Sequence, residues 1–367
     1  MKSIKKAVIS AVIITLSFSV LFAKGKEKQP LKAEQLQRPL LLRITDNGFR
    51  LIWNDNKPSA AVTLTEKGAK TVRIQPVTGT VSGKDSGFYA DFENLTPGKT
   101  YTYKISGHKK ASFTAPSSDS PFTFAAISDH QTFPELTEKG FNCVASEKPD
   151  CIISAGDMLE DGKVKNWNEN FFQKIPLLCG IPFAAAEGNN DAGFELFKSY
   201  LGLENRYYSC TYGNTRFLMI NTNIPVRPDS EQYAWLEKTL SENKSRWTVA
   251  VFHKGAYLSS VPDKSFLKVR DDLIPLLEKY GTDLIINGHN HFYDRTSPIN
   301  GITYVSLPCM SGSITKIQVN ENSGYYEKTI PEFRGYAVCT VTKDSIHITV
   351  KDLDGTVRDE FAINKKE

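Results

Sequence analysis

The pattern of apolar and polar positions changes near residue 120. Up to residue 114 the apolar positions form short runs, separated by turn residues such as Asp46-Asn47-Gly48 and Thr96-Pro97-Gly98. These runs predict strands over 40–44, 49–53, 60–64, 71–74, 88–92, 100–105 and 111–114. Seven short strands without helical periodicity predict an all-β sandwich, with boundaries at residues 38 and 116.

Beyond residue 121, continuous apolar runs alternate with helical patterns. The runs predict buried strands over 122–127, 151–155, 183–186, 217–220, 247–252 and 284–286. Further strands are expected near the C-terminus, over 337–341, 346–350 and 360–363. The alternation predicts an α/β domain over residues 121–367, in which layered sheets are flanked by helices.

Two of the helical patterns have recognisable ends. A helix is expected over 233–240, and Asp229 with Gln232 predicts a capping box at its start. A second helix is expected over 272–280, where Gly281 is a natural stop.

The N-terminus is basic and then apolar. Lys2, Lys5 and Lys6 precede an apolar stretch over 7–23, and the chain turns polar at Lys24. This order predicts a secretory signal peptide over residues 1–23, and therefore export to the periplasm or the extracellular space. An uncleaved membrane anchor is the alternative, because about 17 apolar residues lie at the lower limit of a spanning helix. After removal of the signal we expect no stable membrane span.

Composition excludes little, but it argues against one class of partner. Of the 367 residues, 40% are hydrophobic and 23% are charged, as in ordinary soluble proteins. The net charge is +4, and removal of the three lysines of the predicted signal leaves 42 basic residues against 41 acidic ones. Without a basic excess we expect no nucleic-acid partner. The cysteines have no CxxC spacing, so we expect most of them to be buried and unpaired, without a metal role.

Side chains with metal-ligand chemistry follow five of the predicted strands. They are Asp129, Asp157, Asn189, His253 and the pair His289 and His291. In an open α/β sheet the loops after the carboxyl ends of the strands gather ligands. A bridging carboxylate suits two ions about 3.5–4 Å apart. Imidazoles together with carboxylates favour Fe, Zn or Mn over Ca. Glycines precede three of these residues and let the backbone approach an ion or a phosphate closely.

These residues resemble the signature of a known family. The ordered set Asp129, Gly156-Asp157, Gly188-Asn189, His253 and Gly288-His289-Asn290-His291 is similar to that of the calcineurin-like metallophosphoesterases. The segments 207–214, 230–236 and 288–295 resemble the purple acid phosphatase branch, and residues 95–103 resemble the end of a fibronectin type III-like domain.

The resemblance implies a site and a reaction. One divalent or trivalent ion would be held by Asp129, Asp157 and His291. The other would be held by Asp157, Asn189, His253 and His289, with Asp157 as the bridge. The implied activity is that of an acid phosphatase, which hydrolyses small phosphate esters with a metal-bound hydroxide as the nucleophile.

Three positions depart from the family pattern. Glu160 replaces the metal-binding tyrosine, so the purple colour is not expected, and Gln131 stands where the wider superfamily often has histidine. Either residue could complete the shell of the first ion. Asn190 replaces the histidine that contacts the phosphate and protonates the leaving group, and an amide donates no proton at neutral pH. His130 and Lys254 are the candidate catalytic substitutes.

Two classes of function remain open at this point. The leading hypothesis is an exported two-metal phosphoesterase, and the sequence does not separate monoester from phosphodiester substrates. The alternative is a metal-binding pseudoenzyme or surface protein whose sandwich binds glycan or protein. The complete ligand set favours the enzyme, whereas Asn190 favours the alternative.

The signal peptide leads to a first prediction. Mass spectrometry of the natively expressed protein should find an N-terminus near Lys24, because the apolar stretch ends at Ala23. An intact Met1 in a membrane fraction would instead indicate the uncleaved anchor.

Overall fold

The structure is a computed structural model that describes residues 39–54, 61–81, 84–175, 178–191, 194–260, 264–314, 316 and 324–365. The predicted signal peptide lies outside these described residues. Within the described ranges, no helix has the length and apolar character that a membrane crossing requires.

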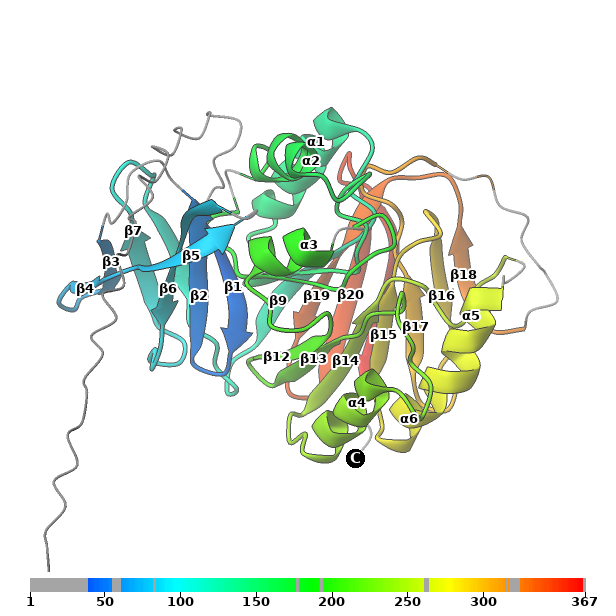
Figure 1. The fold of residues 1–367 in the computed structure, drawn as a ribbon. Coiled ribbons are helices and arrows are strands. Elements are labelled where there is room, and N and C mark those ends of the chain that lie inside the picture. Colours follow the sequence, from blue (N-terminus) through cyan, green and yellow to red (C-terminus); the bar gives the residue numbers. More distant parts are fainter. Residues whose placement is uncertain are drawn as a thin grey trace, which may run out of the picture. The chain divides into compact units, whose positions relative to one another are not determined.

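Two four-stranded antiparallel sheets form the N-terminal region (Figure 1). In sheet order, the first contains β1 (Leu40–Thr45), β2 (Gly48–Asn54), β6 (Lys84–Phe92) and β5 (Val77–Val81). The second contains β4 (Val72–Ile74), β3 (Val62–Glu66), β7 (Thr100–Lys104) and β8 (Ala111–Thr114). Phe113 of β8 stacks on Phe92 of β6 with the ring centroids 5.8 Å apart, so the sheets share an apolar interior. The predicted β-sandwich is confirmed, and β5 is a strand that the sequence pattern missed.

Two mixed sheets form the rest of the described chain. The first has the order β11 (Phe183–Ala185), β10 (Cys151–Ser154), β9 (Phe122–Ile127), β19 (Gly335–Val341), β20 (Ser345–Asp352) and β21 (Val357–Asn364). The second has the order β12 (Tyr208–Tyr212), β13 (Thr215–Met219), β14 (Trp247–Phe252), β15 (Leu284–Asn287), β17 (Thr303–Ser306), β16 (Tyr293–Thr296) and β18 (Tyr326–Ile330). Strands β9 to β11 are parallel, as are β13, β14, β15 and β17.

Helices cover the outer faces of both sheets. Beside the first sheet lie α1 (Pro134–Ser146), α2 (Val164–Asn166), the π-helical turn η2 (Trp167–Phe172) and α3 (Phe194–Leu201). Beside the second lie α4 (Glu231–Ser241), α5 (Lys264–Lys268), the π-helical turn η3 (Val269–Leu273) and α6 (Ile274–Lys279). Phe141 and Trp167 pack with Ile152 on one side, and Leu236 packs with Ala250 on the other. The predicted α/β arrangement of layered sheets flanked by helices is confirmed.

The start of α4 differs from the predicted capping box. The N-cap is Ser230, whose hydroxyl accepts a hydrogen bond from the backbone N–H of Tyr233 (3.3 Å), and not Asp229. Gln232 is buried and bonds to the backbone of Asn221 instead. The Gln232 side chain therefore makes a tertiary contact instead of the predicted capping contact.

One apolar core runs from the sandwich into the mixed sheets. Tyr212 contacts the rings of Phe49 and Phe122, with centroids 6.5 and 5.0 Å away. The Tyr212 hydroxyl donates to the carbonyl oxygen of Thr114 (3.1 Å). The hydroxyl of Tyr103 likewise donates to the carbonyl oxygen of Cys179 (2.5 Å). Cys151, Cys210, Cys309 and Cys339 are buried and form no disulfide, as expected. The predicted domain boundaries themselves remain a prediction.

The shared core leads to a stability prediction. Phe113 is 4% exposed and contacts the rings of Phe49, Phe92 and Tyr101. Phe113→Ala should therefore lower the free energy of unfolding by about 3–5 kcal/mol in denaturant titrations followed by circular dichroism. The control Val72→Ala alters a side chain that is 58% exposed and should leave stability unchanged. We expect one transition, and two transitions would indicate that the sandwich unfolds by itself.

Candidate metal centre

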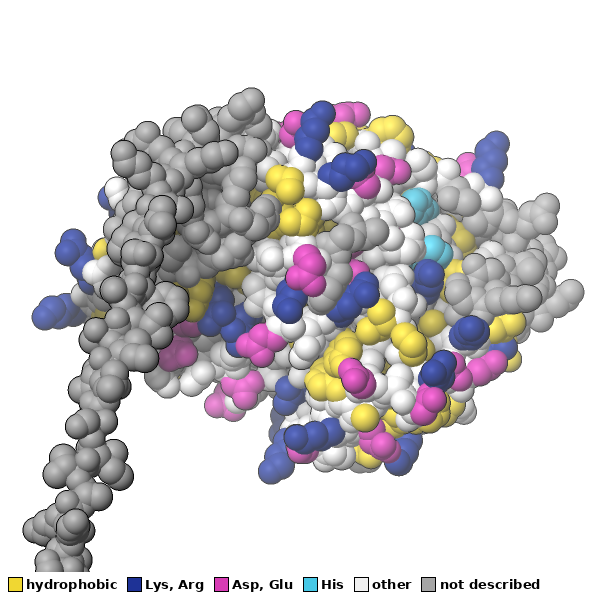
Figure 2. All heavy atoms as spheres, in the orientation of Figure 1, with side chains coloured by type: hydrophobic (Ala, Val, Ile, Leu, Met, Phe, Trp, Pro, Cys, Tyr) yellow, Lys and Arg dark blue, Asp and Glu magenta, His cyan; other side chains and the backbone are white. Residues whose placement is uncertain are grey.

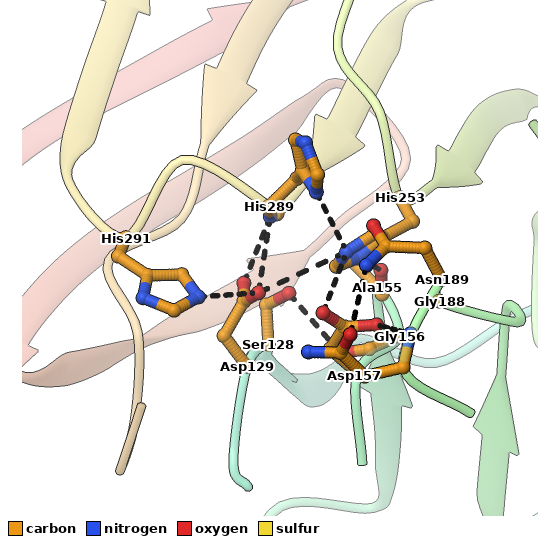
Figure 3. A network of polar contacts seen from close by, with 12 residues as sticks. Ser128, Asp129, Ala155, Gly156, Asp157, Gly188, Asn189, His253, His289 and His291 are labelled. Carbon is orange, nitrogen blue, oxygen red and sulfur yellow. Dashed lines mark hydrogen bonds and ion pairs between the residues drawn. The ribbon is translucent and has the colours of Figure 1, made fainter. Parts of the chain in front are cut away.

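The six predicted ligands lie in loops at the carboxyl ends of five strands. Asp129 follows β9, Asp157 follows β10, Asn189 follows β11, His253 follows β14, and His289 and His291 follow β15. Figure 3 shows these side chains gathered in one network of polar contacts. Figure 2 shows histidine side chains at the surface with Lys and Arg side chains nearby, and both His289 and His291 are half-buried.

Two groups of donor atoms share His253. Donor atoms of Asp157, His253 and His289 lie within 4.8 Å of one another. His253 Nε2 is 3.1 Å from Asp157 Oδ2 and 3.2 Å from His289 Nδ1. On the other side, His291 Nε2 is 3.1 Å from Asp129 Oδ1, which is 3.9 Å from His253 Nε2.

Burial and charge act against each other on these groups. Burial favours the neutral forms, but the carboxylates of Asp157 and Asp129 raise the pKa of the buried His253 to about 9. Burial likewise disfavours the Asp129 carboxylate, yet His253 and His291 lower its pKa to about 2. Burial and the neighbouring His253 lower the pKa of His289 to about 4. The arrangement therefore stabilises two buried carboxylates and concentrates positive charge between them.

Backbone contacts orient the ligands. His253 Nδ1 lies 2.9 Å from the carbonyl oxygen of Ala155, so this nitrogen carries a proton and Nε2 faces the cluster. Asp129 Oδ2 accepts from the N–H of His289 (2.9 Å), and Asp157 Oδ1 accepts from the N–H of Asn190 (2.7 Å). These bonds fix the side chains before any ion is bound.

Four of the ligands have a left-handed backbone. The φ angle is 51° at Asp129, 51° at Asp157, 76° at His289 and 60° at His291. This region costs a non-glycine residue about 1–2 kcal/mol. Such outliers concentrate at functional sites, where the surrounding structure holds them in place.

Two glycines let loops approach the carboxylates without a side chain between them. A Cβ on Gly188 would lie 2.1 Å from Asp157 Oδ1, and one on Gly288 would lie 2.5 Å from Asp129 Oδ2. Because the obstacles include backbone and ligand atoms, neither position accepts a side chain without moving the site. Both glycines thus allow the loops to approach these carboxylates closely, while their approach to an ion or a phosphate remains a prediction.

Buried acids that sequence reasoning missed support the Gly188 loop. The Asp191 carboxylate accepts from the N–H groups of Met158 and Gly188, both at 2.8 Å. Burial and the charge of Asp157 raise the pKa of Asp191 to about 7. Glu187 pairs with Arg206 and accepts from Asn221 Nδ2 (2.6 Å). Asp191 directly follows Asn190, but nothing in the local pattern separates it from a surface acid.

Within the described chain, neither candidate for the first ion's remaining ligand has a side-chain hydrogen bond or ion pair with the six predicted ligands. Glu160 is exposed, and its Oε2 accepts from the hydroxyl of Thr132 (2.5 Å). Gln131 is 2% exposed, and its Oε1 has no hydrogen-bond partner among the described residues. A buried oxygen without a partner is the type of atom that an ion could use.

The candidate catalytic residues are placed differently from one another. The His130 ring is fully buried against Phe141 and Phe171 (5.2 and 6.0 Å between centroids), in the core on the helix side of the sheet. Asn190 is half-buried, and its Oδ1 accepts from Asn189 Nδ2 (3.0 Å). Lys254 lies near enough to His289 for its charge to contribute to the lowered pKa of that imidazole. Asn190 and Lys254 thus lie near the ligand cluster at half-buried positions. The His130 ring lies close enough to Asp129 and Asp157 for their charges to act on its pKa, but it is enclosed by aromatic side chains.

Taken together, the donors fit transition-metal ions. They combine buried carboxylates with imidazoles, and backbone contacts hold both types in position. Such mixed oxygen and nitrogen sets suit Zn, Mn or Fe.

Comparisons with known proteins agree with this chemistry. Residues 122–293 match the sequence profile of the family described as calcineurin-like phosphoesterase. This stretch of the chain therefore resembles the calcineurin-like phosphoesterases. A segment of 235 residues is 28% identical to probable purple acid phosphatase 20 of Arabidopsis thaliana, covering 56% of this chain and 54% of the relative. Another, of 185 residues, is 28% identical to probable inactive purple acid phosphatase 1 of that plant, covering 42% and 30%.

A solved structure shares the fold. The purple acid phosphatase PPD1 from seeds of yellow lupin (Lupinus luteus) superimposes with a TM-score of 0.76 at 20% identity, covering 89% of this chain and 74% of that chain. The chain spans about half or less of the length of the two curated relatives, 54% and 30%. The predicted resemblance to calcineurin-like phosphoesterases and to purple acid phosphatases is confirmed, while the roles of single site residues remain predictions.

The cluster leads to a prediction about metal binding. Asp157→Asn keeps the shape of the side chain but removes its charge, so metal affinity should fall by at least about tenfold. Elemental analysis after reconstitution with Zn, Mn or Fe measures the metal content, and circular dichroism shows whether the variant is folded. The control Asp150→Asn alters an acid that precedes β10, whereas Asp157 follows it, and should leave metal content unchanged. Equal metal content in both variants would contradict the assignment of Asp157.

Proposed function

We propose that this protein is an exported phosphoesterase that uses two metal ions to hydrolyse small phosphate esters. The observation that carries the proposal is the cluster of Asp157, His253 and His289, whose donor atoms lie within 4.8 Å of one another in a phosphoesterase domain. Export rests on the basic and apolar N-terminus, and the compartment would be periplasmic or extracellular.

The ligands divide naturally between two ions. We assign Asp129, Asp157 and His291 to one ion, since His291 approaches Asp129 (3.1 Å). We assign Asp157, Asn189, His253 and His289 to the other, since these imidazoles group with Asp157. Bound Fe, Zn or Mn ions would lower the pKa of a coordinated water and neutralise charge on the phosphoryl group.

The residues around the ligands have roles of their own. Asp157 is held by the N–H of Asn190, and the Asn190 amide can donate a hydrogen bond to a phosphate oxygen without supplying a proton. Lys254 adds a positive charge near His289, where it would favour binding of an anionic ester. With His130 buried in an aromatic core, protonation of the leaving group has no donor among the predicted catalytic residues other than Lys254.

The second candidate is a metal-binding protein without hydrolysis. Asn190 favours it, because its side chain bonds to Asn189 and lacks a titratable proton. One relative at 28% identity also carries the description "probable inactive". The ligand cluster is common to both candidates, so metal binding alone does not separate them.

The separating experiment is a substrate screen on the metal-loaded mature protein. We expect hydrolysis of at least one phosphomonoester or phosphodiester, dependent on bound metal and abolished by a chelator. A folded protein that retains its metal and hydrolyses neither class would support the pseudoenzyme. Preference between the two ester classes decides between phosphatase and phosphodiesterase activity.

Asn190 leads to a further prediction about substrates. An alkyl leaving group needs a proton, whereas p-nitrophenolate departs without one, and a positioned general acid contributes about 10²–10⁴ in rate. The natural enzyme should therefore prefer aryl esters, and Asn190→His should raise turnover of alkyl phosphates much more than that of p-nitrophenyl phosphate. Steady-state kinetics with both substrates measures the ratio. If the substitution changes neither rate, another group protonates the leaving group, and Lys254→Gln is the next variant.

A further inference from the structure

Arg334 directly precedes β19, a strand of the sheet whose strands β9, β10 and β11 lead to three of the predicted ligands. β19 runs antiparallel to β9, with Ala337 opposite Ala126. If this register is continued by three residues, Arg334 comes opposite Asp129. The loop after β17 lies between the two residues: the Gly335 N–H donates to the carbonyl oxygen of Cys309, and the Gly312 N–H donates to that of Asp129.

The loop after β17 connects Arg334 to two predicted ligands. The N–H of Gly312 donates to the backbone oxygen of Asp129 (2.9 Å), and a Cβ on Gly312 would lie 2.9 Å from His291 Cε1. Arg334 Nε donates to the carbonyl oxygen of Gly312 (3.2 Å). Gly312 therefore separates the guanidinium from His291, so Arg334 lies one residue beyond the ligands.

The guanidinium is held in position but not neutralised. Its central carbon lies 5.4 Å from the ring centroid of Phe133, in the loop after β9. Among the described residues, its terminal nitrogens have no hydrogen-bond acceptor and no carboxylate partner. Three other arginines pair directly with carboxylates: Arg50 with Asp91, Arg206 with Glu187 and Arg295 with Asp359. A half-buried guanidinium with its terminal donors open is suited to bind an anion from outside the protein.

We propose that Arg334 binds a second anionic group of the substrate, carried by the leaving group. The inference rests on the proposed function, because the phosphoryl group itself would bind at the ligand cluster. Since Arg334 lies beyond His291, it would meet a carboxylate or a second phosphate a few bonds away from the scissile ester. Arg334 is then a residue that determines specificity, and the preferred substrates are phosphomonoesters with an anionic leaving group.

The test uses two substrates of the same shape that differ by one charge, 4-carboxyphenyl phosphate and 4-carbamoylphenyl phosphate. For the carboxy ester, Arg334→Gln should raise KM about tenfold and leave kcat unchanged, because a charge-assisted hydrogen bond to bound substrate is lost. The carbamoyl ester should show no change in either constant. Arg334→Lys keeps the charge without the planar fork and should fall between the wild type and Arg334→Gln.

A binding measurement makes the result independent of turnover. Calorimetry with 4-carboxybenzylphosphonate and its 4-carbamoyl counterpart should give the same charge-dependent difference on the metal-loaded protein. The matched control is Arg246→Gln, because Arg246 Nε also donates to a backbone carbonyl, that of Lys343 (3.1 Å). Arg246 pairs with Asp344, however, and it precedes β14 at the opposite end from His253. This variant should discriminate between the probes as the wild type does.

Two results would overturn the inference. One is an equal loss of affinity for both probes in Arg334→Gln, which would assign Arg334 a structural role in holding Gly312 and Phe133. The other is no change for either probe. A wild-type protein that binds the phosphonates with the expected charge dependence but hydrolyses no ester would refute the proposed hydrolysis and leave the role of Arg334 intact.

Discussion

Neutralisation of two buried carboxylates is the constraint on which the site depends. Asp129 and Asp157 are 0% and 2% exposed, and a buried carboxylate without a compensating charge costs several kcal/mol. His253 lies between them, at 3.9 and 3.1 Å, and accounts for part of that compensation. The left-handed backbones and the two glycines hold these carboxylates in a buried position that is unfavourable for negative charge. A cation at this place would relieve the same cost, which is a physical reason for the predicted metal site.

The groups that compensate the charges change with distance from this centre. Asp191, one layer away, is stabilised by backbone N–H groups, and burial raises its pKa to about 7. Glu187 lies behind the same loop and has a full partner in Arg206. At the rim, Lys254 and Arg334 carry positive charge without a carboxylate partner among the described residues. Negative charge is thus satisfied inside the protein, whereas positive charge remains available at the edge from which an anionic substrate would arrive.

The sequence predicted the strands and the ligand loops well, because both depend on neighbouring residues. Apolar runs mark β9, β10, β14 and β15, and the polar residues directly after them reach the site. It could not predict which way a side chain turns. Asp129 and His130 are adjacent, yet Asp129 contacts His291 whereas the His130 ring packs on Phe171, and the left-handed backbone at Asp129 (φ 51°) is not visible in the local pattern. Arg334 and Gly312 were missed for another reason. Gly312 reaches Asp129 from the loop after β17, and Arg334 reaches Gly312 from the residue before β19, so both depend on contacts between distant segments that no local pattern encodes.

The position of β19 also shows that the stretch matching a sequence profile differs from the structural unit. The stretch that matches the phosphoesterase profile ends at residue 293, whereas β19 lies between β9 and β20 in the middle of the first mixed sheet. Cutting the chain at the limits of the match would expose the hydrogen-bonding edge of β9, the strand that leads into Asp129. It would also remove β17 and with it the loop that contacts Asp129 and His291. The stretch that matches the family profile is therefore shorter than the stretch whose strands and loops surround the predicted ligands.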